Sequence, residues 1–587
     1  MKILTNHLGY ELNGPKHAVI LGTKDDHPQA FQIKNVETGE VVFEGKPIEV
    51  GPVHKWRDWY FWTLDFDSLS EKGQFFIKCF SDQNPICSFP FSIEPNLLER
   101  NTLSDAIYYF KAQRCSGLLD QADRDLSFVP PRPDSVDVHG GWYDASGDYG
   151  KHLSHLCYSN FFNPQQTPLT AWVLFKTYDL LNQRDDPNFK EYKTRLLDEG
   201  LYGADHLVRL KDPGGSFYIS IQRTEPGNRP EDRRIAKRMA DYSIASTTKK
   251  ADFHMSDSGE IQAYEAGYRS GAGLAIAALA RASTYSLPGD FEPQVYLETA
   301  GAAFAFLEAN NLSFTNDGRE NIIDDYCALL AAVELFRATH KQIYLQAAKK
   351  RAGSLMDRLI TVGKYQNYWC ADGNDRPFFH ASDAGLPLVS LLAYYEIASE
   401  SDRERILTTV EKSLRFELAI TAEVPNPFGY SRQLVQSKTG QRRTSFFFPH
   451  DSEAAPWWQG ENARLASLAA AARLAAPLFR TNAGFLQQLQ VFAADQLNWI
   501  LGLNPFDVCM LDGSGRNNPE YLYFESYAYA NCPGGICNGI TSGLHDEEDI
   551  DFHLSIPGED HDWRWGEQWL PHASWYLLAV AARDPAN

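Results

Sequence analysis

The spacing of hydrophobic residues along the chain changes near residue 95. Before that point, short β-rich runs alternate apolar and polar residues and are separated by turn signals. Short strands at regular spacing are typical of a β-sandwich. The runs that predict strands are 17–21, 29–35, 41–45, 61–65, 73–79 and 89–93.

After residue 96 the hydrophobic period changes from 2 to 3.6 residues, which indicates helices. Several of these helices are apolar on nearly every face, as in 270–280, and such helices are buried between others. Inner and outer helices that alternate, as in an α/α barrel, satisfy this requirement. The segments that predict helices are 98–118, 167–183, 192–208, 260–284, 293–310, 321–338, 341–362, 384–400, 402–421, 461–479, 483–501 and 567–582.

Four long connections interrupt the helices, and loops of such length are usually functional. They are 119–166, 211–259, 422–460 and 503–566. A chain of 587 residues is too long for one core. We therefore expect two domains, an all-β sandwich over 1–95 and an all-α barrel over 96–587.

The net charge and the first residues of the chain limit the partners and the cellular compartment that we expect. The formal net charge of −21 disfavours nucleic acid and anionic membranes, which bind basic surfaces. No apolar run reaches the roughly 20 residues of a membrane span. The first residues lack the apolar region of a secretory signal, and nine scattered cysteines favour a reducing compartment. We expect a cytoplasmic protein, although a secreted chain with its signal removed would look similar.

The segment 139–151 carries the clearest chemistry. It reads His-Gly-Gly-Trp-Tyr-Asp-Ala-Ser-Gly-Asp-Tyr-Gly-Lys. Glycines allow close backbone approach to a ligand, and Trp142 and Tyr143 offer flat faces for stacking on sugar rings. Asp144 and Asp148 can hold one water between them, as an inverting glycosidase requires on its base side. Two turn aspartates that only cap the next structural element are the alternative.

This segment resembles the signature of glycoside hydrolase family 9, which includes many cellulases. Further resemblances follow in the family's order along essentially the whole chain. Residues 6–16 resemble the start of the immunoglobulin-like module that precedes many family 9 catalytic domains, and 324–339 resemble a barrel helix. Residues 497–505 resemble the segment before the substrate loop. Asp562, five residues before Glu567, resembles the motif that carries the catalytic acid.

The resemblance implies an (α/α)6 barrel behind an immunoglobulin-like domain, and hydrolysis of β-1,4-linked hexosides with inversion. It makes Asp148 the general base, Asp144 a second holder of the water, and Glu567 the general acid. Ser146 is an insertion relative to the family's Asp-Ala-Gly-Asp. A bulge must absorb it, or the roles of Asp144 and Asp148 exchange.

Glu567 opens a predicted helix, and a helix N-terminus lowers the pKa of a carboxyl group. An acid role therefore requires desolvation by tryptophans such as Trp565, which we also expect near the sugar, or a neighbouring carboxylate.

Two segments depart from a cellulase. The substrate loop lacks the family's Pro-His-His-Arg and carries Arg516 and Glu520 instead. The segment 449–462 combines acids with adjacent tryptophans, of which at least one should face a surface or cleft. Its predicted substrate contacts are Asp451, Glu453, Trp457, Trp458 and Glu461. Extra carboxylates would suit a sugar that bears an ammonium group.

The main functional hypothesis is an exo-acting enzyme on short β-linked glucosamine or glucose oligosaccharides, close to the exo-β-D-glucosaminidase and cellobiase-like branch. The alternatives are an endo-β-1,4-glucanase and a non-catalytic carbohydrate-binding protein. We interpret His152 and His155 as polar residues on a helix that leaves the turn rather than as metal ligands. We expect no organic cofactor. Calcium is a weaker alternative for 545–551, which lacks calcium-loop spacing and reads as solvated charge.

Overall fold

The computed structural model describes most of the chain. The described residues are 1–81, 84–157, 159–184, 186–223, 229–237, 242–244, 253–255, 263–315, 317–453, 458–523, 528–529, 531–552 and 562–583.

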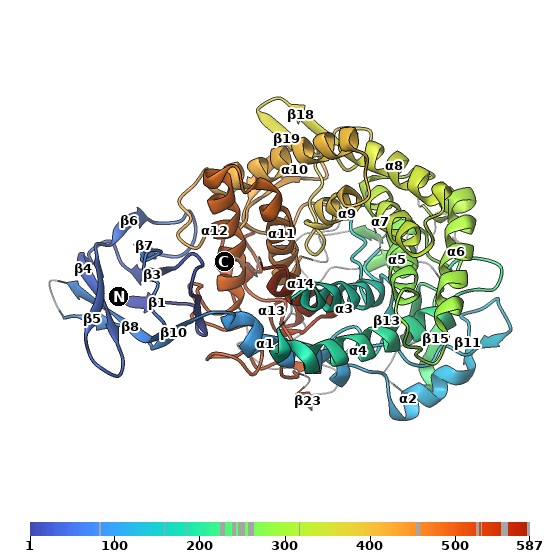
Figure 1. Cartoon of the computed structure of the whole chain (residues 1–587), viewed down its shortest axis with the longest axis horizontal. Coiled ribbons are helices and arrows are strands. Elements are labelled where there is room, and N and C mark those ends of the chain that lie inside the picture. Colours follow the sequence, from blue (N-terminus) through green and yellow to red (C-terminus); the bar gives the residue numbers. More distant parts are fainter. Residues whose placement is uncertain are drawn as a thin grey trace.

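The first ninety-odd residues form a sandwich of two sheets, with strand orders β1-β3-β7-β6 and β2-β10-β8-β4-β5. It lies at one end of the molecule (Figure 1). Every strand predicted from alternation is present to within two residues at each end. The strands are β1 (Lys2–Leu4), β2 (Gly9–Glu11), β3 (His17–Gly22), β4 (Pro28–Asn35), β5 (Val41–Gly45), β6 (Ile48–Gly51), β7 (Tyr60–Asp65), β8 (Gly73–Ser81), β9 (Ile86–Cys87) and β10 (Phe91–Glu94).

Alternation works here because each sheet buries one face. Ile20, Ile33, Leu64, Phe75 and Ile77 are buried in the sandwich core. The strand β10 ends at Glu94 and the first helix begins at Leu97, and we propose the domain boundary between them.

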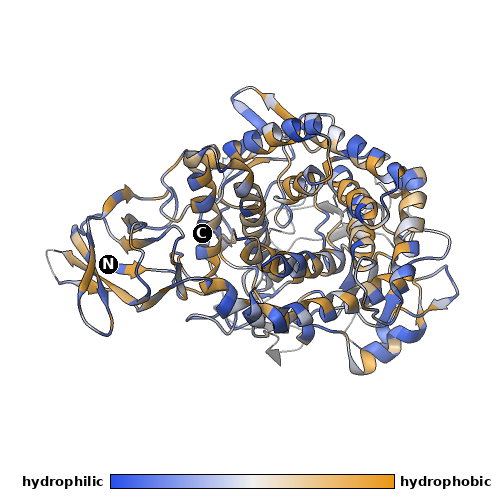
Figure 2. Ribbon diagram, in the orientation of Figure 1, coloured by the Kyte–Doolittle hydropathy of each residue, from blue (hydrophilic) through white to orange (hydrophobic). Residues whose placement is uncertain are grey.

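The helical domain is a double ring. Helices of the inner ring are buried along most of their length, and each packs on the next until the last contacts the first. Figure 2 shows this ring as largely hydrophobic. The inner helices are α3 (Thr167–Asn182), α5 (Gly273–Ala282), α7 (Ile322–Thr339), α9 (Leu386–Tyr395), α11 (Asn462–Ala475) and α14 (Leu570–Ala581).

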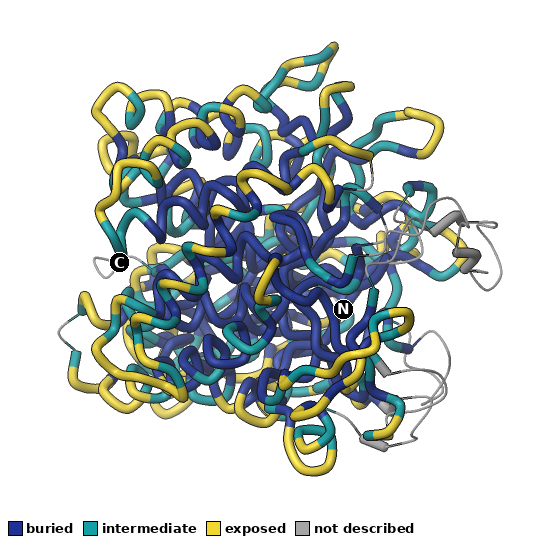
Figure 3. The backbone as a smooth tube through the Cα atoms, turned by 90° about the vertical axis from the view of Figure 1, so that its right-hand side faces the viewer, coloured by how far each residue is buried: buried dark blue, intermediate teal, exposed yellow. Residues whose placement is uncertain are grey.

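The outer helices each precede an inner one in the chain and have one exposed face. They are α1 (Leu97–Ala112), α4 (Lys190–Arg209), α6 (Pro293–Asn310), α8 (Gln342–Asp357), α10 (Glu400–Thr421) and α12 (Ala483–Ile500). Viewed from the side, the buried segments occupy the middle of the molecule (Figure 3). The closed ring of six inner helices confirms the predicted (α/α)6 barrel.

All four long connections run from an outer helix to an inner one. Because outer and inner helices alternate in direction, these connections gather at one end of the barrel. Short elements form within them: α2 (Gly117–Ala122), β11 (Leu126–Ser127), β12 (Ser135–Val136), β13 (Lys151–His152), β14 (Ser220–Arg223), β15 (Arg233–Ile235), β16 (Tyr242–Ile244), β17 (Phe253–Met255), β20 (Gln433–Gln436), β21 (Arg442–Ser445), β22 (Leu522–Tyr523), β23 (Ala528–Tyr529), β24 (Thr541–Ser542), β25 (Ile550–Asp551) and α13 (Trp563–Gly566). A further hairpin follows α8, with β18 (Leu359–Val362) and β19 (Tyr365–Trp369).

Two predicted helices begin later than expected. The helix predicted from 260 begins as α5 at Gly273, after a π-helical turn in which Gly271 has φ 110°. A Cβ at Gly271 would lie 2.5 Å from the Cβ of Leu153, so the close approach to that loop requires glycine. The last helix begins at Leu570, and Glu567 before it has extended backbone with φ −65° and ψ 129°.

The two domains share an extensive interface. Trp56 of the sandwich is fully buried and packs on Phe446 and Trp499 of the barrel. The Glu11 carboxylate accepts hydrogen bonds from the backbone N–H groups of Leu97 and Leu98, each at 3.1 Å, and so caps α1.

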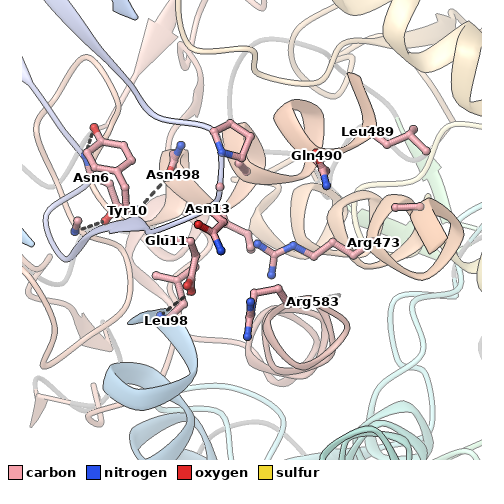
Figure 4. A pocket seen from close by; sticks show the side chains of 16 residues that line it. Asn6, Tyr10, Glu11, Asn13, Leu98, Arg473, Leu489, Gln490, Asn498 and Arg583 are labelled. Atoms are coloured by element: carbon pink, nitrogen blue, oxygen red, sulfur yellow. Dashed lines mark hydrogen bonds between the residues drawn. The ribbon is translucent and has the colours of Figure 1, made fainter. Parts of the chain in front are cut away.

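A pocket at this interface is lined by residues of both domains, including Glu11, Asn13, Arg473, Gln490 and Arg583 (Figure 4). None of the predicted site residues lines this pocket, so it is separate from the predicted chemistry.

Within the described residues, no helix combines the length and the apolar character that crossing a membrane requires.

Candidate active site

The turn that carries Asp144 and Asp148 is held by backbone hydrogen bonds. The N–H of Asp144 donates to the carbonyl of Gly150 at 2.9 Å, and the N–H of Asp148 donates to the carbonyl of Ala145 at 3.2 Å. Gly147 sits between the two acids with φ 86°, in the left-handed region that favours glycine. Both carboxylates are therefore presented by one short, defined turn.

The inserted Ser146 joins this turn to the segment that carries Glu567. The N–H of Ser146 donates to the carbonyl of Gln568 at 2.8 Å, and the N–H of Gln568 donates to Ser146 Oγ at 2.7 Å. An isolated bridge pairs Ala145 with Trp569. The insertion is thus absorbed as a link between the two acid-bearing segments.

Asp144 is buried, and no lysine or arginine among the described residues pairs with it. Its Oδ1 accepts hydrogen bonds from Gln166 Nε2 and, at 3.1 Å, from Trp569 Nε1, while Oδ2 lies 3.3 Å from His155 Nδ1. Burial is the main cause that raises the pKa of Asp144, to about 7; His155 opposes this and the charge of Asp148 adds to it. The two aspartates are therefore electrostatically coupled.

Asp148 is half-buried, and its Oδ1 accepts the N–H of Gly150 at 2.8 Å. Glu567 contacts Asn538, whose N–H donates to the Glu567 carbonyl at 2.7 Å and whose Nδ2 lies 3.5 Å from Oε2. Removal from water, and then the charges of Asp148 and Asp144, raise the pKa of Glu567 well above its ordinary value. Because Glu567 precedes the helix rather than opening it, the predicted lowering of its pKa by a helix N-terminus is wrong.

A buried ion-pair centre supports the turn from behind. Lys151 Nζ lies 2.7 Å from Asp123 Oδ2, and Arg233 Nε lies 2.7 Å from Asp123 Oδ1. Lys151 also donates to the carbonyls of Val138 and Gly140, and Arg233 donates to that of Tyr149. Sequence reasoning missed this centre, because its members lie far apart along the chain.

Three aromatic residues predicted to contact sugar are structural. Trp142 is fully buried and its Nε1 donates to Glu199 at 2.7 Å. The hydroxyl of Tyr143 contacts the backbone of Ser116, with its ring largely buried. Trp565 is fully buried and meets Trp458 edge to face. The predicted stacking roles of Trp142, Tyr143 and Trp565 are wrong, because none has a face open to a ligand.

The acids of the second segment are bound to arginines. Asp451 pairs with Arg443 at 2.9 Å, Glu453 pairs with Arg376, and the buried Glu461 pairs with Arg464 at 2.8 Å. Glu461 is therefore an internal structural group rather than a sugar contact, and Asp451 and Glu453 are each held by an arginine.

The structure describes one of the two adjacent tryptophans of this segment. Trp458 is largely buried, with its ring stacked on His450 at 4.0 Å between centroids and on the Arg564 guanidinium at 4.2 Å. Trp457 lies outside the described residues.

Of the two substrate-loop residues, Arg516 is bound away from the aspartate turn. Arg516 pairs with Asp507 at 2.6 Å and its guanidinium stacks on Phe89 of the sandwich, so it belongs to the domain interface. Glu520 is exposed.

The acids of the run 545–551 are exposed or half-buried, as the prediction of solvated charge requires, and several form surface ion pairs. Asp546 and Glu548 pair with Lys55 at 3.0 and 2.7 Å, and Glu547 pairs with Arg443.

Two histidines complete the surroundings of the aspartates. His152 lies in β13 rather than on a helix, which corrects the prediction, and its ring stacks on His155 with centroids 4.2 Å apart. One ligand atom from each of Asp144, Asp148, His152 and His155 lies within 4.8 Å of all the others. Their spacing in the sequence had made them visible, but nothing in it showed that both rings turn toward the acids.

Comparison with known proteins agrees with this arrangement. A model of the glycosyl hydrolase family 9 matches residues 100–533, and a model of the cellulase N-terminal ig-like domain matches residues 1–84. No curated protein matches the chain.

Two solved structures share the whole fold. One, a metagenome-derived glycoside hydrolase family 9 endoglucanase, has a TM-score of 0.64 and 19% identity over 99% of this chain and 98% of its own. The other, a GH9 protein of Bacteroides ovatus, has a TM-score of 0.64 and 20% identity over 100% of this chain and 99% of its own. At these identities the likeness concerns the fold.

Proposed function

This chain belongs to glycosyl hydrolase family 9, a family of enzymes that act on carbohydrates, and from that premise we propose that it cleaves β-1,4-linked hexosides with inversion. Asp148 is the proposed general base and Glu567 the proposed general acid. Asp144 is proposed to share the nucleophilic water with Asp148. The observation that carries this assignment is the link from Ser146 to Gln568, which brings the aspartate turn against the segment of Glu567.

The electrostatics support a division of labour. The raised pKa of Glu567 suits a carboxyl group that must hold a proton at neutral pH and pass it to the leaving oxygen. In the proposed step, water attacks the anomeric carbon as the glycosidic C–O bond breaks. Asp148 takes the proton of the water, and Glu567 gives its proton to the departing sugar oxygen. The product has the opposite anomeric configuration.

For the substrate, we propose a β-1,4-glucan cleaved internally. The metagenome-derived neighbour with this fold is an endoglucanase of the same family. The acids that had suggested an ammonium-bearing sugar are largely paired with arginines, which weakens the exo-glucosaminidase hypothesis.

One observation keeps the amino-sugar hypothesis as a second candidate. Glu520 is exposed in the loop where the resemblance places the substrate contacts of cellulases. A carboxylate there could pair with an ammonium group.

Hydrolysis of carboxymethyl-cellulose, cellobiose and the β-1,4-glucosamine disaccharide at equal concentration separates these candidates. Falling viscosity of the polymer supports the endoglucanase. Fast cleavage of the glucosamine disaccharide alone would overturn it in favour of the second candidate. Glu520→Gln then provides the matched variant, since only cleavage of the amino sugar should depend on its charge.

If the unmodified protein binds these sugars but hydrolyses none of them, it is a carbohydrate-binding protein instead. The anomer formed first, read by NMR, tests inversion directly. A product that retains the β configuration would contradict the roles of both acids.

A further inference from the structure

The two histidines beside the aspartates suggest a second capacity of the same turn. We propose that Asp144, Asp148, His152 and His155 bind one divalent transition-metal ion of the zinc class, and that the bound ion blocks hydrolysis. The binding stands on the geometry alone, whereas the inhibition rests on the proposed function.

The four side chains are close to a coordination shell. One atom from each lies within 4.8 Å of the others. Around a tetrahedral zinc ion, with ligand bonds of about 2.0–2.2 Å, neighbouring ligand atoms lie roughly 3.4 Å apart. Side-chain movements of about 1 Å would therefore close the shell, and such movements need no change of the backbone.

The donor set selects the metal. Two imidazole nitrogens and two carboxylate oxygens suit zinc and its neighbours in the first transition row. Calcium and magnesium prefer shells made of oxygen alone.

Neighbouring groups already orient the ligands. His152 Nδ1 contacts Ser220 Oγ at 2.5 Å, which leaves Nε2 to face the aspartates. Gln166 contacts both His155 Nδ1 and Asp144 Oδ1, and Trp569 holds the same Asp144 oxygen. Hydrogen bonds to the outer side of metal ligands fix their orientation in known sites.

The backbone leaves room for the approach of His152 and Asp148. A Cβ at Gly150 would overlap the His152 ring and lie 3.1 Å from Asp148 Oδ1. The imidazole nitrogen and the carboxylate oxygen therefore meet over a position where only glycine fits.

Occupancy would stop the proposed reaction for a simple reason. An ion held by Asp144 and Asp148 takes the lone pairs that must otherwise orient and deprotonate the water. Zinc would thus lower kcat in proportion to the occupied fraction, and chelation would restore it.

The test measures binding apart from activity. Metal-free protein is titrated with ZnCl2 by calorimetry, and Co²⁺ serves as a visible spectroscopic probe. We expect one ion per chain with micromolar or tighter affinity. His152→Gln and His155→Gln should each weaken binding at least about 10-fold, in line with the loss seen when metal sites are altered. The control is His27→Gln, an exposed histidine of the sandwich.

Unchanged zinc affinity in both histidine variants, with thermal unfolding like that of the unmodified protein, would overturn the site. If one variant fails to fold, the other variant and the Co²⁺ spectrum of the unmodified protein decide. Stoichiometric binding with full hydrolysis would overturn the inhibition while leaving the site. Absence of hydrolysis of every sugar without metal would contradict the proposed function, and the calorimetric result would be unaffected.

Discussion

Asp123 and Asp144 lie on the same connection, both deeply buried, and have opposite surroundings. Asp123 contacts Lys151 and Arg233; burial alone would raise its pKa, but these cations outweigh burial and lower it to about 2. Asp144 forms no ion pair with a lysine or arginine in the described part of the chain, and burial raises its pKa to about 7. A buried carboxylate that is fully paired holds the fold, and one left without a cation is available for proton chemistry.

A pair of glutamates repeats the contrast. Glu334 is buried between inner helices, where Arg281 and Arg337 outweigh burial and lower its pKa to about 2. Glu567 instead meets Asn538 and the negative aspartates. Cations therefore lie beside Asp123 and Glu334, whereas burial raises the pKa of Asp144 and Glu567, which have no lysine or arginine partner among the described residues.

The largest effect should come from Asp148, the proposed base beside Asp144. Asp148→Asn keeps the size of the side chain but removes the base, and we expect kcat to fall at least ~10³-fold. Binding of oligosaccharide, measured by calorimetry, should change little. Asp125→Asn, an exposed residue of the same connection, is the control. Turnover above a tenth of the starting value would disprove the base assignment.

Breaking the paired group should instead damage the fold. Asp123→Asn leaves Lys151 and Arg233 buried without their anion, and we expect the free energy of unfolding to fall by about 3–5 kcal/mol. Urea denaturation measures this change. A loss below 1 kcal/mol would mean that the ion-pair centre contributes little and that the contrast with Asp144 is not energetic.

The unpaired Asp144 should behave in the opposite way and weaken the folded state. Its pKa is higher in the folded protein than in the unfolded chain, where an aspartate titrates near 3.9. The unfolded chain therefore releases this proton first, and stability is lost as pH rises from about 4 to about 7. Asp144→Asn removes that loss.

We expect Asp144→Asn to raise the free energy of unfolding by about 4 kcal/mol at pH 8 and by less than about 1 kcal/mol at pH 4. Urea denaturation at the two pH values measures it. Equal effects at both would contradict the raised pKa of Asp144.

The smallest effect concerns the link between the acid-bearing segments. Ser146→Ala leaves the buried N–H of Gln568 without its acceptor and should cost about 1–2 kcal/mol of stability. Ser154→Ala is a matched control, because Ser154 is equally buried and its Oγ has no hydrogen-bond partner among the described residues. Similar losses in both variants would show that the Ser146 link is not specific.

The strands and the barrel could be predicted because each depends on local periodicity. The strand β8 appears within two residues of its prediction, since Phe75, Ile77 and Cys79, every second side chain, face the same core. The turn at 144–148 was also visible, because glycines and acids follow one another in a short segment. The family model ends at residue 533, so Glu567 lies beyond the family match, and its role stays a prediction.

What could not be predicted depends on partners distant in sequence. Trp142 looked suited to a sugar ring, yet Glu199 on α4 accepts its N–H in the interior. The acids at 451 and 453 looked available for substrate until Arg443 and Arg376 folded against them. The sequence shows the charge of such a residue but not which residue, if any, forms an ion pair with it.

The bridge between Ala145 and Trp569 has a consequence for how the enzyme becomes active during synthesis and folding. It joins backbone segments separated by more than four hundred residues of chain, and no local contact can replace it. During synthesis the aspartate turn emerges long before Glu567 is translated. A nascent chain therefore carries the proposed base without its acid, and hydrolytic competence should arise only when the ring closes, late in folding and all at once.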